Sequence, residues 1–399
     1  MSENQPREYD VVLGGDSQTP VDGVVLGGIE GVKRRLKNPD LKAQVAGLYQ
    51  ALNYGEAGLE LIIQAWQNEL GNIKHIAHSL LREREEATVK QALEEYNPWL
   101  KMDCIHTLQD VSLCFAINSN RKVFFKSVNS INILDIDTGE IEVTSMNHVN
   151  LRNIIISPNG KKMITRGGES HFNSGIAIWD LHTQERLFFF NEASGRHDPS
   201  SLAISPDGSK LFCAVYYANT GINIWDLNTG ENISNFPSKS YEQVKKLAIS
   251  KDGKIIISSG NDYYIKVRNV ETKELIYAFK HKEAENSIES LAISPNGKIV
   301  VSASQCGRIR IWNLETKKLQ FTLEEHKAWV YCVAISPDGS TIVSCSRDKK
   351  IKIWDLYTGE CIRILKGHTH WVYNVAISPD GKTLASSSSD GTVKIWGLK

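Results

Sequence analysis

The chain has 399 residues, of which 41% are hydrophobic and 23% charged, and its 46 basic side chains balance 46 acidic ones. These values are ordinary for a globular protein. They exclude a strongly basic nucleic-acid-binding chain, so no nucleic-acid partner is expected. The charge is unevenly distributed, because residues 1–100 are acidic by five charges and the remainder is basic by five.

The sequence predicts a cytoplasmic protein without a membrane span. The N-terminus lacks a basic start followed by an apolar core, so no secretory signal is expected. No run of about 18 apolar residues occurs. The seven cysteines include no CxxC pair, which favours reduced, mostly buried thiols. No spacing typical of metal ligands is present, and no cofactor is expected.

Residues 1–22 are polar and contain Gly14, Gly15 and Pro20, which predicts an extended leader. The segment VVLGG occurs twice, at 11–15 and 24–28. Neither copy continues as the glycine-rich loop that binds phosphates, since the GxxxxGK[ST] and GxGxxG patterns are both absent. We therefore interpret these glycines as turns before a helix.

Residues 23–99 have the hydrophobic period of helices and are predicted to form a small helical domain. Asp40 is placed to cap a helix whose apolar face carries Leu41, Val45 and Leu48. Glycines at 55 and 71 separate further amphipathic stretches. This segment resembles HEAT-type helix pairs and, more narrowly, helical segments of cyanobacterial proteins related to phycobilisome lyases. The alternative is a plain helical bundle packed on the rest of the chain.

From residue 100 onward the sequence repeats. The motif AISPDG of the last copy recurs with spacings of 39 to 48 residues, and Asn118 stands in a degraded first copy. Its serines are Ser157, Ser205, Ser250, Ser294, Ser336 and Ser378. A second mark follows each serine and is Trp-Asp in three copies; tryptophan occurs there in five copies, as Trp179, Trp225, Trp312, Trp354 and Trp396.

A period of this length closing on Trp-Asp resembles the WD-repeat family. The resemblance covers residues 100–399 and implies a seven-bladed β-propeller, one four-stranded sheet per copy. The fold class expected is mainly β with a small α domain. The last copy lacks its fourth strand, whereas residues 104–108 match an outer strand without a blade of its own. We expect residues 104–108 to complete the last blade and close the ring, which removes exposed sheet edges.

The resemblance also implies a hydrogen-bonded network within a blade, formed by a histidine, a serine, an aspartate and the repeat tryptophan. Two copies have all four residues: His326, Ser344, Asp348 and Trp354, and His368, Ser386, Asp390 and Trp396. A serine, a histidine and an aspartate also suggest a catalytic triad. Repetition argues against catalysis, because an enzyme needs one site while a structural network recurs in each blade. Other copies depart from the pattern, with Cys306 at the aspartate position and Arg268 at the tryptophan position.

The propeller face where outer strands lead into inner ones is the expected binding surface, because WD-repeat proteins commonly hold partners there. The matching positions are Trp329, Tyr331, Arg347, Trp371, Tyr373, Ser389, Glu289, Lys245 and Arg152. Tryptophan, tyrosine and arginine are enriched at interface hot spots. The alternative is that these aromatic side chains pack between neighbouring blades.

The sequence therefore predicts a non-catalytic, monomeric scaffold that binds one or more partner proteins through the propeller face and the helical domain. One alternative is an accessory or chaperone factor for a light-harvesting or other large assembly. Another is a small-ligand receptor or enzyme that uses the central channel of the propeller.

Overall fold

The computed structural model describes residues 28–68 and residues 73, 76, 77, 80, 81, 84, 86–89, 92 and 99 of the N-terminal part, and residues 101–398 with gaps at 112, 128–129, 147–150, 171–172, 192–198, 216–220, 237–242 and 282–286. The expected leader over residues 1–22 lies outside the described residues. In the described part of the chain, no helix is long and apolar enough to cross a membrane.

Three α-helices open the described chain: α1 (Ile29–Leu36), α2 (Leu41–Ala51) and α3 (Gly55–Asn68), with a short 3-10 turn, η2 (Leu52–Tyr54), between the last two. Asp40 caps α2 by accepting hydrogen bonds from the backbone N–H groups of residues 42 and 43. Gly55 has a φ of +56°, which a residue with a side chain rarely adopts, and this glycine separates α2 from α3.

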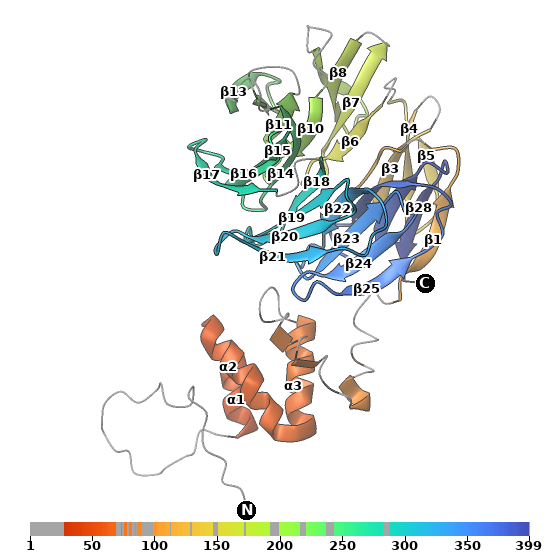
Figure 1. The fold of residues 1–399 in the computed structure, drawn as a ribbon. Coiled ribbons are helices and arrows are strands. Elements are labelled where there is room, and N and C mark those ends of the chain that lie inside the picture. Colours follow the sequence, from red (N-terminus) through yellow and green to blue (C-terminus); the bar gives the residue numbers. More distant parts are fainter. Residues whose placement is uncertain are drawn as a thin grey trace, which may run out of the picture.

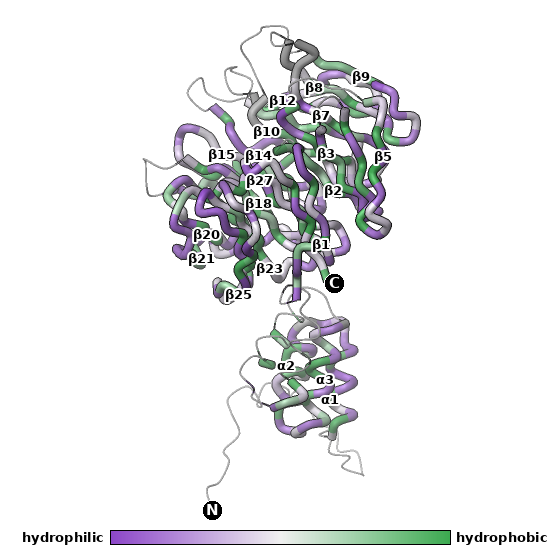
Figure 2. The backbone as a smooth tube through the Cα atoms, turned by 90° about the vertical axis from the view of Figure 1, so that its right-hand side faces the viewer, coloured by the Kyte–Doolittle hydropathy of each residue, from purple (hydrophilic) through white to green (hydrophobic). Residues whose placement is uncertain are grey.

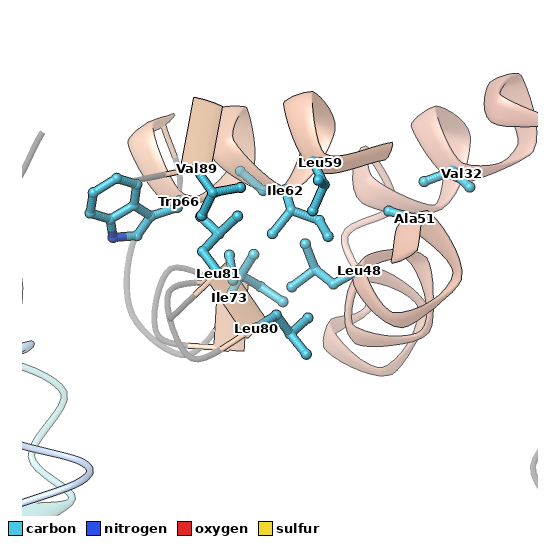
Figure 3. Close-up of a cluster of buried hydrophobic side chains, with 12 residues drawn as sticks. Val32, Leu48, Ala51, Leu59, Ile62, Trp66, Ile73, Leu80, Leu81 and Val89 are labelled. Atoms are coloured by element: carbon cyan, nitrogen blue, oxygen red, sulfur yellow. The ribbon is translucent and has the colours of Figure 1, made fainter. Parts of the chain in front are cut away.

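The helices share one apolar core, shown in Figure 3. Leu48, Ile62 and Leu81 are fully buried there, and Trp66 closes one end. Figures 1 and 2 both place the helices to one side of the sheets. Because these buried side chains come from the helices themselves, the helices are held together by their own apolar core.

The rest of the chain forms seven four-stranded antiparallel sheets, which confirms the predicted seven-bladed propeller (Figure 1). We number the blades in chain order, from blade 1 (β2–β5) to blade 7 (β26–β28 with β1). The strands are β1 (Asp103–Leu108), β2 (Phe115–Ile117), β3 (Lys122–Lys126), β4 (Ile131–Asp135), β5 (Ile141–Val143), β6 (Asn153–Ile156), β7 (Lys162–Ser170), β8 (Asn173–Asp180), β9 (Arg186–Asn191), β10 (Pro199–Ile204), β11 (Lys210–Val215), β12 (Ile222–Asp226), β13 (Asn232–Phe236), β14 (Val244–Ile249), β15 (Ile255–Gly260), β16 (Tyr264–Asn269), β17 (Leu275–Lys280), β18 (Ile288–Ile293), β19 (Ile299–Ser304), β20 (Ile309–Asn313), β21 (Lys318–Leu323), β22 (Val330–Ile335), β23 (Thr341–Ser346), β24 (Ile351–Asp355), β25 (Cys361–Leu365), β26 (Val372–Ile377), β27 (Leu384–Ser388) and β28 (Val393–Gly397).

The repeated serine builds the turn between the first two strands of its blade. In blade 6, Ser336 Oγ donates to Asp338 Oδ1 (2.5 Å) and accepts from the backbone N–H of Thr341 (2.9 Å). Gly339 follows with a φ of +74°, which explains the glycine of the motif. In the degraded first copy, Asn118 Oδ1 accepts from two backbone N–H groups in place of the serine. The turn chemistry of each copy thus fixes the register of its first hairpin.

The two ends of the propeller segment meet in blade 7. Strand β1 pairs antiparallel with β28, with Asp103 opposite Gly397 and Leu108 opposite Val393. An arginine adds a polar link between blades 1 and 7, because Arg121 Nη1 lies 3.3 Å from Asp380 Oδ2 and 2.8 Å from Thr383 Oγ1. The ring is therefore closed by a strand pairing and by side-chain contacts across the same junction.

Neighbouring blades are joined by packed apolar faces and by polar contacts between their first strands. Figure 2 shows hydrophobic and hydrophilic positions interleaved along the strands. Ser290 Oγ on β18 accepts from the backbone N–H of Val333 on β22 (3.2 Å). Ahead of β1, Trp99 and Met102 are buried in a cluster with side chains of blades 6 and 7. The segment that precedes the propeller is thus anchored on its two most C-terminal blades.

Candidate functional site

The structure brings together the four network residues in blades 6 and 7. In blade 6, His326 Nδ1 lies 2.8 Å from Asp348 Oδ2, and His326 Nε2 lies 2.8 Å from Ser344 Oγ. Trp354 Nε1 donates to the same serine oxygen at 2.8 Å. Because an ionised carboxylate can only accept, Nδ1 carries the proton and Nε2 accepts the serine O–H.

Blade 7 repeats this arrangement with nearly the same geometry. His368 Nδ1 lies 2.9 Å from Asp390 Oδ2, His368 Nε2 lies 2.8 Å from Ser386 Oγ, and Trp396 Nε1 donates to that oxygen at 2.8 Å. Ser386 is fully buried, as is its counterpart in blade 6. Since a substrate cannot reach either hydroxyl from the surface, the geometry fits a rigid internal link between two strands, the hairpin that joins them and the loop that enters the blade.

In blades 2, 4 and 5 the residue at the repeat tryptophan position also donates to a hydroxyl. Trp312 donates to Ser302 and Trp179 to Thr165, at 2.9 and 2.8 Å. In blade 4, Arg268 replaces the tryptophan and its Nη1 donates to Ser258 Oγ at 3.0 Å.

In blade 5, Arg310 rather than an aspartate contacts the buried ring of His281, with Nη1 2.7 Å from Nε2. The sequence alone did not identify these two arginines as network members. Arg268 stands at the position of the repeat tryptophan, whereas Arg310 stands two residues before Trp312, where blades 6 and 7 have Lys352 and Lys394.

Lowering the pH should reduce the stability of blade 7 in two steps, the first of which comes from His368. Burial lowers the pKa of His368 more than nearby Asp390 raises it, so the unfolded chain takes up this proton near pH 6.5 while the folded protein does not. Burial also acts to raise the pKa of Asp390, but hydrogen bonds from Thr392, the Thr369 backbone and His368 outweigh it and lower the pKa to about 2. The histidine contribution is therefore lost as the pH falls below about 6.5, and the aspartate contribution as it falls from about 4 to 2.

Melting temperatures of the wild type and of His368→Gln, measured between pH 7.5 and 5.0, check the first of these windows. The variant lacks the titrating ring, so the advantage of the wild type should shrink as the pH falls. An advantage that is the same at pH 7.5 and pH 5.0 would show that His368 does not titrate in this way.

The predicted partner-binding residues of blades 6 and 7 form one cluster, which we call the aromatic–arginine cluster: Trp329, Tyr331, Arg347, Trp371 and Tyr373. The guanidinium carbon of Arg347 lies 4.1 Å from the centre of the Trp371 ring and 5.5 Å from that of Trp329. The two tyrosine rings lie 4.6 Å apart, and each also contacts one of the indoles. Indole rings of two blades thus contact one cation, and the two tyrosines pack beside them.

The cluster is open to solvent on one side. Trp329 is 38% exposed, whereas Trp371 and both tyrosines are half-buried. Burial raises the pKa of Tyr331. The rings therefore pack between neighbouring blades and are also partly exposed to solvent. Packing between blades and a role as a binding surface, the two interpretations of the sequence, are compatible in this cluster.

Of the remaining predicted residues, Ser389 lies next to the cluster, and the other three lie on blades 5, 4 and 2. Glu289 on blade 5 accepts a hydrogen bond from Gln305 Nε2 at 2.7 Å. Ser389 is exposed next to Trp371, and its hydroxyl lies 3.4 Å from the Trp371 carbonyl oxygen. Lys245 on blade 4 reaches Ser287 on the next blade, with 3.5 Å between Nζ and Oγ. Arg152 is exposed on blade 2, outside the cluster.

All seven cysteines are free thiols. Cys332 and Cys345 stand opposite each other on β22 and β23. A hydrogen bond between the two thiols lowers the pKa of Cys332, and burial raises that of Cys345. Over the described residues, no group of three or more histidine, cysteine or acidic side chains is placed to hold a metal ion.

Comparison with known proteins agrees with this geometry. The family model described as "WD domain, G-beta repeat" matches residues 273–313, 317–355 and 359–397. These segments contain Trp312, Trp354 and Trp396, each of which donates to a serine of its blade. No curated protein matches the chain. The chain therefore carries WD40 repeats, and they form part of a seven-bladed β-propeller.

Proposed function

We propose that the protein is a monomeric, non-catalytic scaffold that binds a partner protein through the aromatic–arginine cluster of blades 6 and 7. WD40 propellers commonly serve as protein-interaction scaffolds. The observation that carries the proposal is the position of the Arg347 guanidinium over the rings of both Trp371 and Trp329, with one indole exposed. Large, rigid aromatic groups and arginine are the side chains that contribute most binding free energy at protein interfaces.

The rigidity of the underlying strands supports this role. Trp329 and Trp371 immediately precede β22 and β26, and each carbonyl oxygen accepts a backbone hydrogen bond from the hairpin of its own blade, at 2.8 and 3.0 Å. The buried histidine networks belong to the same two blades. A surface held in one conformation loses little conformational entropy on binding.

The proposal includes the helical segment as a second docking surface. We take residues 23–99 as the helical domain and residues 100–399 as the propeller, and we retain HEAT-like helix pairing as part of the proposal. Exposed Tyr49 on α2 is an aromatic side chain available for such a contact. Two linked surfaces would raise the overall affinity for a complex that contains both targets, because the second contact forms at a high effective concentration.

Affinity purification with mass spectrometry tests the proposal, with the wild type compared with the double variant Trp329→Ala/Trp371→Ala. Loss of two aromatic anchors should weaken binding by at least about 30-fold, so partners of the wild type should disappear. The matched control is Ile276→Ala/Leu319→Ala, which removes exposed apolar side chains from the outer strands β17 and β21. Partners retained by the cluster variant, with its melting temperature unchanged, would refute the proposed surface.

A further inference from the structure

The guanidinium of Arg347 contacts two indole rings. The residue lies in the hairpin between β23 and β24, and its backbone N–H donates to the Trp329 carbonyl oxygen at 2.8 Å. Its guanidinium carbon lies over the ring of Trp371 from the next blade, 4.1 Å from the ring centre, and 5.5 Å from the centre of Trp329. The side chain is therefore ordered by stacking before any ligand arrives.

These contacts with the indole rings do not use the hydrogen-bond donors of the guanidinium. The five N–H donors lie in the plane of the group and point away from its faces. Among the described residues, no acceptor or carboxylate is bonded to the Arg347 side chain. The acidic residue of the adjacent blade, Glu289, is instead bonded to Gln305. A positioned, planar set of donors without an acceptor is the arrangement that binds a carboxylate through two parallel hydrogen bonds.

The charges around the cluster favour an anion over a cation. Lys327 and Lys349 are exposed in the loops beside Arg347. Asp348 and Asp390, the acidic residues of the two hairpins, are turned to the buried histidines. A lysine or arginine from a partner would meet these like charges, and the guanidinium of Arg347 already lies over both indole rings.

We propose that the aromatic–arginine cluster is a site for a carboxylate of an acidic peptide segment in the partner, with Arg347 as the anchor. The carboxylate comes from a glutamate or aspartate side chain or from a C-terminus. Trp329 and the two tyrosines hold an apolar side chain next to it. This inference rests on the proposed function and names the chemistry of the partner segment.

Fluorescence anisotropy with labelled peptides tests the carboxylate directly. The probe is an amidated hexapeptide with two glutamates flanking a leucine–phenylalanine pair, and the comparison peptide has glutamines instead. The full-length protein should bind the glutamate peptide about 10- to 100-fold more tightly, because a charge-assisted bidentate pair is lost in the glutamine peptide. The glutamine peptide with a free C-terminal carboxylate distinguishes the two sources, since recovery of binding there assigns the site to a C-terminus. Equal binding of the glutamate and amidated glutamine peptides would overturn the proposal, as would a phosphoserine version that binds more than tenfold more tightly than the glutamate one.

Three variants separate the role of the guanidinium from general charge. Arg347→Gln should abolish the preference for glutamate over glutamine. Arg347→Lys should keep only part of it, because lysine retains the charge without the planar donors. Lys327→Gln removes an exposed neighbouring charge and should change the affinity by at most about threefold. Equal effects of Arg347→Gln and Lys327→Gln would overturn the assignment of Arg347 as the anchor.

The failure of this inference can be distinguished from failure of the proposed function. If the tryptophan double variant loses its partners while Arg347→Gln keeps them, the cluster is the docking surface but the carboxylate site is wrong. If neither variant loses partners, the docking surface itself is wrong.

Discussion

Replacing residues 103–108 with a glycine–serine segment of the same length should lower the melting temperature by about 10 °C or more and make the protein oligomerise. The replacement removes β1 and leaves the backbone groups of β28 without a partner strand. It also uncovers buried apolar side chains at the junction of blades 7 and 1, among them Val393 and Ile395. Burial of one such side chain contributes about 1.5–3 kcal/mol, a large share of a total stability of about 5–15 kcal/mol. An unpaired strand edge next to apolar side chains also pairs readily with another chain.

Moving the strand rather than deleting it provides the control. A variant that carries the glycine–serine segment at 103–108 and a copy of Asp103–Leu108 after Lys399, joined by the turn sequence of residues 356–360, restores the usual strand order within one chain. This variant should regain the melting temperature and elute as the wild type does in size-exclusion chromatography. A glycine–serine variant that stays at the wild-type elution volume and melting temperature would show that β1 does not hold the ring closed.

The repeat pattern predicted the architecture because each copy carries its own turn chemistry. A serine that bonds to the residue two positions on and to the backbone five positions on fixes one hairpin, and it does so wherever it recurs. Counting these serines therefore counts blades, and even the degraded copy at Asn118 builds the turn with an equivalent acceptor. The residues of the two complete networks also lie together, because equivalent repeat positions occupy equivalent places in every blade.

The pattern could not predict contacts that depend on two different blades. The stack of Arg347 on Trp371 joins the hairpin of one blade to the loop of the next, and only the distance and angle between blades bring the groups together. The repeat pattern also could not predict how a blade compensates for a missing network residue. In blade 1 the tryptophan and serine positions are filled by Leu134 and Phe125, both buried, so packing replaces a hydrogen bond there. In blade 3, Trp225 Nε1 is buried without a hydrogen-bond partner among the described residues.

Removing the serine hydroxyl from a complete network should cost more stability than removing it from an incomplete one. Ser386→Ala takes away the acceptor of Trp396 Nε1 and also the donor to His368 Nε2, so two buried polar groups lose their partner. A buried polar group left unsatisfied costs about 1–3 kcal/mol, which predicts a loss of about 2–4 kcal/mol in the free energy of unfolding. Ser344→Ala should have the same effect in blade 6.

Ser302→Ala in blade 5 is the matched comparison. There, among the described residues, the serine bonds only to Trp312, and Arg310 contacts the histidine ring instead. One group is left unsatisfied rather than two, so the expected loss is about 1–2 kcal/mol. Urea denaturation, with the midpoint and the slope fitted separately, compares the three variants. Equal losses in Ser386→Ala and Ser302→Ala would mean that the histidine bond contributes nothing. A larger loss in blades 6 and 7 would show that the most strongly linked blades are the two that carry the aromatic–arginine cluster, where a docking surface gains most from a fixed scaffold.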